Sequence, residues 1–134
     1  MNKKDLTTNA RLWLGTPWEH NQNKQGIAVD CVNFLWLVAK ESGLDIEPIP
    51  SSYARVARGS TTLEDYLNRN FKYKEDGIIE KNNIILYNFY GYYKHVAIAT
   101  SDSSIIHACY REGKVVEHGI DGVWKYKIVG IWEL

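Results

Sequence analysis

A chain of 134 residues with 45% hydrophobic and 24% charged side chains has the length and composition of one globular domain with a substantial core. Its 16 basic and 16 acidic residues balance, so it lacks the basic excess of a nucleic-acid-binding protein. No stretch approaches the roughly 20 apolar residues of a membrane span, and the N-terminal segment lacks the apolar core of a signal peptide. We expect one domain over residues 1–134, synthesised in the cytoplasm without a signal peptide.

Two helices are expected in the first third of the sequence. Residues 5–14 carry apolar side chains at helical spacing, and the Gly, Pro and Asn residues of 15–26 then break the pattern. Asp30 is a natural N-cap for a second helix, which begins at Cys31 and has a single polar residue, Asn33, before position 40. Gly43 provides its stop signal. We predict that this second helix is buried nearly all round.

The rest of the sequence predicts a short helix followed by a sheet. Thr61 and Glu64 have the spacing of a capping box, which would open a helix that runs to about Asn70. Turn signals then separate five segments rich in β-branched and aromatic residues, at 84–89, 95–100, 104–110, 114–118 and 127–134. Helices followed by antiparallel strands indicate an α+β domain. The helix after Asp30 is expected to pack across the inner face of the sheet.

Cys31 is one of only two cysteines, and it lies at the head of the predicted buried helix. The reactive form of a cysteine is the thiolate, which the unpaired N–H groups and the positive dipole of a helix N-terminus stabilise. Cysteine–histidine peptidases place their nucleophile in such a position. The competing interpretation is a small apolar core residue. A disulfide between Cys31 and Cys109 is disfavoured in a cytoplasmic setting.

His95 and His107 are the candidate partners of Cys31. Strand alternation places His95 on the same face as Ala97 and Ala99, whose small side chains leave room for a helix end or a substrate. If residues 101–103 form a three-residue loop, position 100 pairs with position 104. His95 and His107 then become diagonal neighbours on one face, where His107 can orient the His95 imidazole. A loop of even length would separate the two histidines.

Two other interpretations of the histidines remain, a purely structural role and a zinc site. A histidine on a strand is often a polar residue at the edge of the sheet, or a core residue whose ring nitrogens are hydrogen-bonded within the protein. His20 and His118 fall in predicted loops or strand ends, and no role is assigned to them. Zinc is the competing chemistry, since both cysteines and both strand histidines are permitted ligands. The sequence has no Cys-x-x-Cys and no His-x-x-x-His spacing. We expect no metal and no cofactor.

The segments that carry these residues resemble the NlpC-type peptidoglycan endopeptidases, a papain-like family. "DCVNFLWLVAKESGL" is similar to the family's nucleophile segment, in which Asp-Cys is followed by small residues and an apolar helix. "KHVAIATSDSSIIHACYREGKVVEH" is similar to its base segment, with the family's step of twelve residues from His95 to His107. "LGTPWEHN" is similar to the Thr-Pro-Tyr segment ahead of the cysteine. The resemblance covers the chain from about Leu14 to its C-terminus.

This resemblance implies a papain-like cysteine peptidase fold, in which the nucleophile helix packs on an antiparallel sheet. It implies that Cys31 is the nucleophile, that His95 is the general base and acid, and that His107 orients His95. The backbone N–H of Cys31 would help to hold the oxyanion of the tetrahedral intermediate.

Three residues near the cysteine are expected to contact the substrate: Trp18, Asp30 and Asn33. Trp18 stands where the family often has Tyr, and an indole N–H can donate a hydrogen bond but cannot accept one. Asn33 replaces a small Gly or Ser, which narrows the site. The segment "KNNIILYNF" also lacks the Gly-Asp that normally opens this strand.

The family cleaves the amide between D-γ-glutamate and a diamino acid in peptidoglycan stem peptides, so the implied partner is a peptidoglycan peptide. The compact chain, the lead-in to Cys31 and the C-terminal segment are most similar to the phage-tail or prophage branch. That similarity implies phage tail proteins as partners and action at the cell wall as part of a phage particle. Two other functions fit the same fold: a non-catalytic structural or binding module of a phage tail, and an acyltransferase or deamidase.

Overall fold

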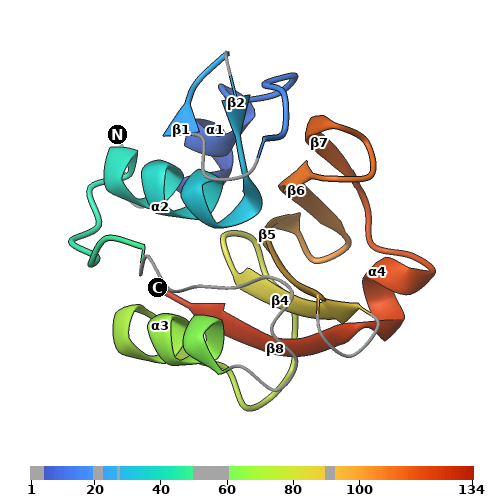
Figure 1. Ribbon diagram of the computed structural model, residues 1–134. Helices are drawn as coiled ribbons and strands as arrows, with labels where there is room; N and C mark the ends of the chain where they lie inside the picture. The colour runs from blue at the N-terminus through green and yellow to red at the C-terminus, as the bar shows by residue number, and fades with distance from the viewer. Residues whose placement is uncertain (1–4, 20–22, 27, 50–60, 90–92) are drawn as a thin grey trace.

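The computed structural model describes residues 5–19, 23–26, 28–49, 61–89 and 93–134 (Figure 1). Within these ranges the helices are α1 (Leu6–Arg11), α2 (Cys31–Glu41), α3 (Thr62–Asn70) and α4 (Val123–Tyr126). The strands are β1 (Asn23–Lys24), β2 (Ala28–Val29), β3 (Lys72–Tyr73), β4 (Ile84–Phe89), β5 (Tyr93–Ser101), β6 (Ser104–Cys109), β7 (Lys114–Gly119) and β8 (Ile128–Glu133). None of the described helices has the length and apolar character needed to cross a membrane.

Six strands form one antiparallel sheet in the order β3-β8-β4-β5-β6-β7, and β1 and β2 pair separately. The C-terminal strand β8 inserts between β3 and β4, so the last segment of the chain is a central part of the sheet. Figure 1 shows α2 lying across the sheet and α4 at the far end, between β7 and β8. The predicted α+β class and the predicted position of α2 on the sheet are confirmed.

Each face of the sheet has its own apolar core. On one face, Val96, Ile98 and Ile106 pack with the buried side chains of α1, α2 and α3. On the other face, a smaller cluster contains Ala97 and Ala99, together with Ile85, Tyr87, Ile105 and Ile131. Successive residues of β5 therefore point to opposite faces, as strand alternation predicts.

The helix that begins at Cys31 has the predicted ends. The Asp30 side chain accepts a hydrogen bond from the backbone N–H of Asn33 at 2.8 Å, which satisfies one of the N–H groups of the first turn. At the other end Ser42 is the C-cap, and Gly43 adopts a φ of +84°, a conformation that glycine reaches without steric cost. Local capping chemistry is sufficient to set both ends.

Two other helix predictions need correction. The first helix ends at Arg11 rather than near Leu14, because the chain continues as tight turns in which Trp13 N–H binds the carbonyl of Ala10. The third helix begins where predicted, but its capping box is wrong. The Thr61 hydroxyl binds the Asp65 carboxylate, and the partner of Glu64 is Lys94 of β5, at 2.7 Å.

Two features that position the site were not predicted from the sequence. The segment from Gly15 to Trp18 pairs with the start of β7: Gly15 N–H binds the carbonyl of Val115 at 3.0 Å, and Trp18 N–H binds that of Gly113 at 2.8 Å. The lead-in to the cysteine thus covers the exposed edge of β7. The second feature is α4, a single helical turn that directly follows the turn signal at 119–122, where no helix was expected.

Gly130 in β8 provides a test of the packing. A Cβ built at this position lies 2.7 and 2.8 Å from ring atoms of Trp132, and that ring is held by a hydrogen bond from its Nε1 to Asn68 at 2.9 Å. We expect Gly130→Ala to lower the free energy of unfolding by about 1–3 kcal/mol, measured by urea denaturation. The control is Gly119→Ala, whose Cβ has no neighbour closer than 3.7 Å. Equal stability of the two variants would contradict the packing described.

Candidate active site

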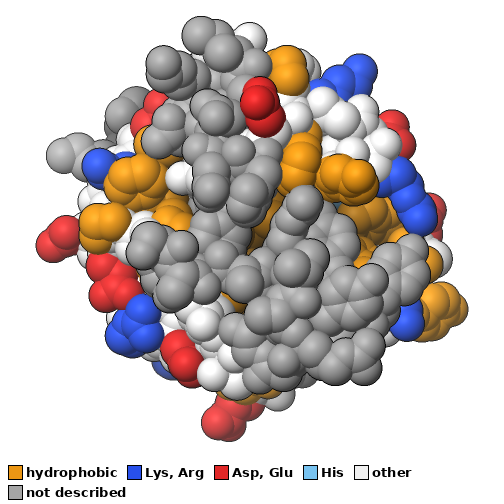
Figure 2. All heavy atoms as spheres, viewed as in Figure 1, with side chains coloured by type: hydrophobic (Ala, Val, Ile, Leu, Met, Phe, Trp, Pro, Cys, Tyr) orange, Lys and Arg blue, Asp and Glu red, His pale blue; other side chains and the backbone are white. Residues whose placement is uncertain are grey.

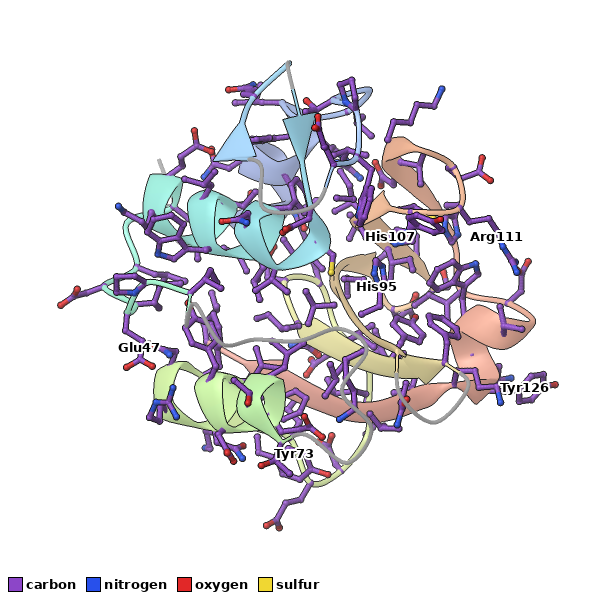
Figure 3. The ribbon with its side chains drawn as sticks, in the orientation of Figure 1. Glu47, Tyr73, His95, His107, Arg111 and Tyr126 are labelled. Atoms are coloured by element: carbon purple, nitrogen blue, oxygen red, sulfur yellow. The ribbon has the colours of Figure 1, made fainter. Side chains whose placement is uncertain are left out.

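Cys31 is the first residue of α2, and it is 6% exposed. It belongs to the same buried cluster as Val96 and Ala108, the residues that directly follow His95 and His107 in β5 and β6. Figure 3 shows the two histidines near the N-terminal end of α2. Neither Cys31 nor Cys109 is part of a disulfide. The thiol therefore lies buried at the tip of a helix that packs against both histidine strands.

Asp30 and Asn33, which were predicted to contact substrate, are hydrogen-bonded to each other. Asp30 is 2% exposed, and its carboxylate accepts from both the backbone N–H and the side-chain amide of Asn33, at 2.8 and 3.1 Å. Asn33 is 9% exposed. In this arrangement the pair holds the first turn of α2, and with it Cys31, in place. A direct contact of either residue with substrate stays a prediction.

The β5–β6 hairpin places His95 and His107 on one face by a route that differs from the expected one. The three-residue loop that was considered for 101–103 does not form, because Ser101 pairs with Ser104 and only two residues make the turn. An irregularity between Ala99 and Ser101 absorbs the extra residue. Beyond it, Ala99 lies opposite position 105, which is the register that the longer loop would have produced. The two histidines consequently share a face.

His95 and His107 are in direct contact. The distance from His95 Nε2 to His107 Nδ1 is 2.6 Å, and the ring centroids lie 4.8 Å apart in an edge-to-face arrangement. His95 is 2% exposed and His107 is fully buried. A buried imidazole needs partners for its polar nitrogens, and each of these rings provides one for the other. The pairing predicted from the sequence is confirmed.

A third histidine extends this pair. The distance from His107 Nε2 to His118 Nε2 is 2.8 Å, and His118 Nδ1 lies 2.9 Å from the carbonyl oxygen of Gly119. No role was expected for His118 from the sequence. The register of β6 and β7, with His107 opposite Val116, places residues 107 and 118 diagonally on one face. Strand alternation across the hairpin of residues 110–113 would have suggested this position, but only the observed register of β6 and β7 fixes it.

Trp124 of α4 is the second site residue that was not predicted from the sequence. Its ring centroid lies 4.6 Å from that of His107, 5.3 Å from that of His118 and 5.8 Å from that of His95. Tyr87 and Phe89 of β4 contact Trp124 edge-on, at 5.2 and 5.4 Å. One aromatic side chain thus covers all three imidazoles. A single helical turn has no periodicity that would reveal it in a sequence.

Burial keeps the imidazoles of His95 and His107 neutral. Desolvation disfavours the charged form and, with a smaller contribution from His118, lowers the pKa of His95 to about 3. The same desolvation, together with repulsion from the neighbouring imidazoles, places the pKa of His107 well below its usual value. At neutral pH both rings are therefore uncharged, and each has one protonated nitrogen and one proton acceptor.

The cysteine and the histidines approach from opposite sides of the sheet. Cys31 and α2 pack on the face of Val96, whereas His95 alternates to the face of Ala97. Among the described residues, the paired register of β5 with β6 ends at Ile98 and Ile106, so both histidines lie where the two strands are no longer paired. The tip of α2 packs against β5 and β6, the strands that carry the two imidazoles.

A cavity of about 770 Å³ lies beside the imidazole pair. Its lining consists of Phe89, His95, Cys109, Tyr110, Arg111, Val123, Trp124 and Lys127. Figure 2 shows hydrophobic side chains at the surface over the region of β6 and α4. The charged side chains in the lining are both cationic, and Figure 3 shows Arg111 beyond His107, toward the periphery. The cavity combines aromatic walls and positive charge, and His95 is part of its lining.

Trp18, the third residue predicted to contact substrate, borders this region. Its ring packs edge-on against Tyr110, with centroids 4.9 Å apart, and Tyr110 lines the cavity. The pairing of residues 15–18 with β7 holds Trp18 in this position. A contact of Trp18 with substrate stays a prediction, but the structure places it one side chain away from the cavity.

The four residues that were considered as zinc ligands do not gather around one point. In the part of the chain that the structure describes, no group of three or more His, Cys, Asp or Glu side chains is arranged to hold a metal ion. Instead, His95 Nε2 and both nitrogens of His107 contact other imidazoles. These nitrogens are consequently engaged in a hydrogen-bond chain rather than directed at a common centre.

The neutral histidines predict how stability depends on pH. The unfolded chain protonates its histidines near pH 6.5, while the folded chain resists protonation of His95 down to about pH 3. Because the unfolded state then binds more protons, acidification below pH 6.5 lowers the free energy of unfolding, by up to about 1.4 kcal/mol per pH unit for each such group. We expect His107→Gln to show a shallower loss between pH 6.5 and 5, measured by denaturant titrations at each pH. Parallel curves for the two proteins would contradict a neutral His107.

Comparison with known proteins identifies the fold. No protein-family profile and no curated protein matches the sequence. The NlpC/p60 domain of the peptidoglycan hydrolase SagA is similar over 100% of both chains, with a TM-score of 0.70 at 17% identity. The peptidoglycan hydrolase RipB from Mycobacterium tuberculosis has a TM-score of 0.72 at 13% identity, over 99% of this chain and 64% of that chain. An NlpC/P60 family protein from Bacillus cereus ATCC 10987 has a TM-score of 0.70 at 20% identity.

The extent of the match differs between these structures. The present chain covers 39% of the Bacillus cereus chain and 41% of a similar NLP/P60 family chain from Staphylococcus aureus, so it spans about two fifths of the length of those proteins. At identities of 13–20% the likeness is one of fold. The chain has the papain-like α+β fold of NlpC/P60 domains.

Proposed function

We propose that this protein is a cysteine peptidase that hydrolyses an amide bond in peptidoglycan stem peptides. The observation that carries the proposal is the 2.6 Å contact between the buried rings of His95 and His107, on strands packed against the helix that begins at Cys31. The fold supports it, since two solved proteins of the same fold are described as peptidoglycan hydrolases. No cofactor is required for this chemistry.

In the acylation step, the Cys31 sulfur attacks the carbonyl carbon of the amide while its proton passes to His95. The N–H groups in the first turn of α2 and the positive end of its dipole stabilise the oxyanion that forms. As the tetrahedral intermediate collapses, the C–N bond breaks and His95 returns the proton to the leaving amine. The products are a thioester on Cys31 and a peptide with a new amino terminus.

In the deacylation step, His95 takes a proton from a water molecule that attacks the thioester. The C–S bond breaks, the carboxylic acid leaves, and the proton returns to the Cys31 sulfur. His107 keeps its contact with His95 throughout and orients the ring. His95 is uncharged at neutral pH, so one of its ring nitrogens has the lone pair with which both steps begin.

The cavity beside His95 suits an anionic peptide. Arg111 and Lys127 supply positive charge, and Phe89, Tyr110 and Trp124 supply apolar walls. A stem peptide that is linked through the γ-carboxyl group of D-glutamate keeps an α-carboxylate next to the scissile amide. We therefore propose cleavage between D-γ-glutamate and the following diamino acid, with a substrate carboxylate near Arg111.

The site of action and the partners belong to the proposal as well. Peptidoglycan as substrate implies action at the cell wall. The association with a phage or prophage tail is supported by the sequence resemblance of the segment ahead of Cys31 and of the C-terminal segment. Copurification of the chain with assembled phage particles would test this association directly.

The cysteine provides the first test of the proposed reaction. We expect the wild-type protein to cleave purified muropeptides and Cys31→Ala to be inactive, with the products identified by mass spectrometry. Cys109→Ala serves as the control, since this second cysteine lies in the lining of the cavity and takes no part in the proposed steps. Equal cleavage by wild type and Cys31→Ala, or no cleavage of any muropeptide, would refute the proposal. Transfer to an added amine in place of hydrolysis would indicate an acyltransferase.

Arg111 tests the proposed substrate orientation. We expect Arg111→Met to raise KM for an acidic stem peptide about fivefold, with little change in kcat, because one solvent-accessible ion pair contributes roughly 1 kcal/mol to binding. Lys125→Met is the matched control, since Lys125 is an exposed cation on α4 outside the cavity lining. The expected KM change should vanish for a substrate whose carboxylate is amidated. An unchanged KM in Arg111→Met would mean that the carboxylate binds elsewhere.

A further inference from the structure

The chain of three imidazoles ends at a group whose hydrogen-bonding role is unambiguous. His118 Nδ1 lies 2.9 Å from the backbone carbonyl oxygen of Gly119. A carbonyl oxygen can only accept, so His118 must carry a proton on Nδ1 to make this bond. In a neutral imidazole the other nitrogen, Nε2, then has the lone pair. The neutral form of His118 is therefore a hydrogen-bond acceptor toward His107.

The acceptor role of His118 fixes the donor and acceptor roles of the other two imidazoles. Since His118 Nε2 accepts, His107 Nε2 must donate across the 2.8 Å that separate them. Burial keeps His107 neutral, so its Nδ1 has the lone pair and accepts from His95 Nε2 across 2.6 Å. His95 thus carries its proton on Nε2. Its remaining nitrogen, Nδ1, is the proton acceptor that the proposed reaction needs.

We propose that His118 is a positioning residue of the active site, which acts through His107 to hold His95 in the tautomer with a basic Nδ1. The inference rests on the proposed function, because a fixed lone pair on His95 matters for a reaction in which His95 removes a proton. Without an acceptor at position 118, His107 could equally well carry its proton on Nδ1. His95 Nε2 would then have to accept, and its Nδ1 would be protonated and unable to act as a base.

The surroundings of His118 are built to hold its ring. Trp124 contacts it at a centroid distance of 5.3 Å, and the same indole covers the other two imidazoles. The edge of β7 is held by the pairing of residues 15–18 and by the ion pair of Arg11 with Glu117, the residue before His118, at 2.8 Å. His118 is nonetheless only half-buried on an edge strand, so a substitution there should leave the fold intact.

Two variants at this position separate the proposed role from simple packing. His118→Phe keeps a flat ring against Trp124 but cannot accept a hydrogen bond. His118→Gln offers an amide oxygen that can accept from His107 Nε2–H. We expect kcat on muropeptides to fall about tenfold in His118→Phe, with KM little changed, and to recover to within about threefold of wild type in His118→Gln. Thermal unfolding of all three proteins controls for stability.

The tautomer itself is measured independently of activity. In protein labelled with ¹⁵N-histidine, NMR distinguishes protonated from unprotonated ring nitrogens. We expect His95 of the wild type and of His118→Gln to show an unprotonated Nδ1 and a protonated Nε2, and His118→Phe to show a mixture of tautomers. An unchanged His95 tautomer in His118→Phe would overturn the inference, and so would an equal loss of kcat in both variants.

This design distinguishes the inference from the proposed function. If the wild type cleaves no muropeptide, the proposed function fails, and the NMR measurement alone decides whether His118 sets the tautomer of His95. If the wild type is active but the spectra of the variants match that of the wild type, the peptidase proposal stands and the role of His118 is refuted.

Discussion

Two imidazoles buried side by side on an apolar sheet face must satisfy each other, and the rest of the site follows from this constraint. His95 and His107 have almost no access to water, so each polar nitrogen has to find a partner within the protein. They provide one bond for each other at 2.6 Å, and His118 provides the next. At His118 the chain of hydrogen bonds reaches the backbone carbonyl of Gly119, at the edge of the sheet.

The same burial determines the chemistry that the imidazoles can perform. Desolvation lowers the pKa of His95 and of His107, so both rings are neutral bases at neutral pH. A neutral histidine has two tautomers, and a catalytic base is useful only when the lone pair is on the nitrogen that faces the nucleophile. A hydrogen-bond chain that ends at a carbonyl selects one tautomer without placing a carboxylate, and hence a buried negative charge, in the apolar face.

Local patterns in the sequence were sufficient for much of the fold. The capping residue Asp30, the apolar run after Cys31 and the stop at Gly43 depend on neighbours within a few positions, and α2 has the predicted ends. Strand alternation likewise places His95 and His107 on one face. The two histidines share a face although the turn has two residues rather than three. A register shift between Ala99 and Ser101 restores the pairing of β5 with β6 that a three-residue turn would give. By contrast, α4 is a single turn without periodicity, and the sequence did not predict it.

The sequence by itself determined the α+β class, the helix that presents Cys31, and the pairing of His95 with His107, because each depends on short-range periodicity and capping. Only the tertiary structure decided that His118 extends the pair, that Trp124 covers all three rings, and that Arg111 and Lys127 line a cavity beside them. These contacts join segments through the packing of α4 and the register of β7. Packing between distant segments leaves no local periodicity from which it could be predicted.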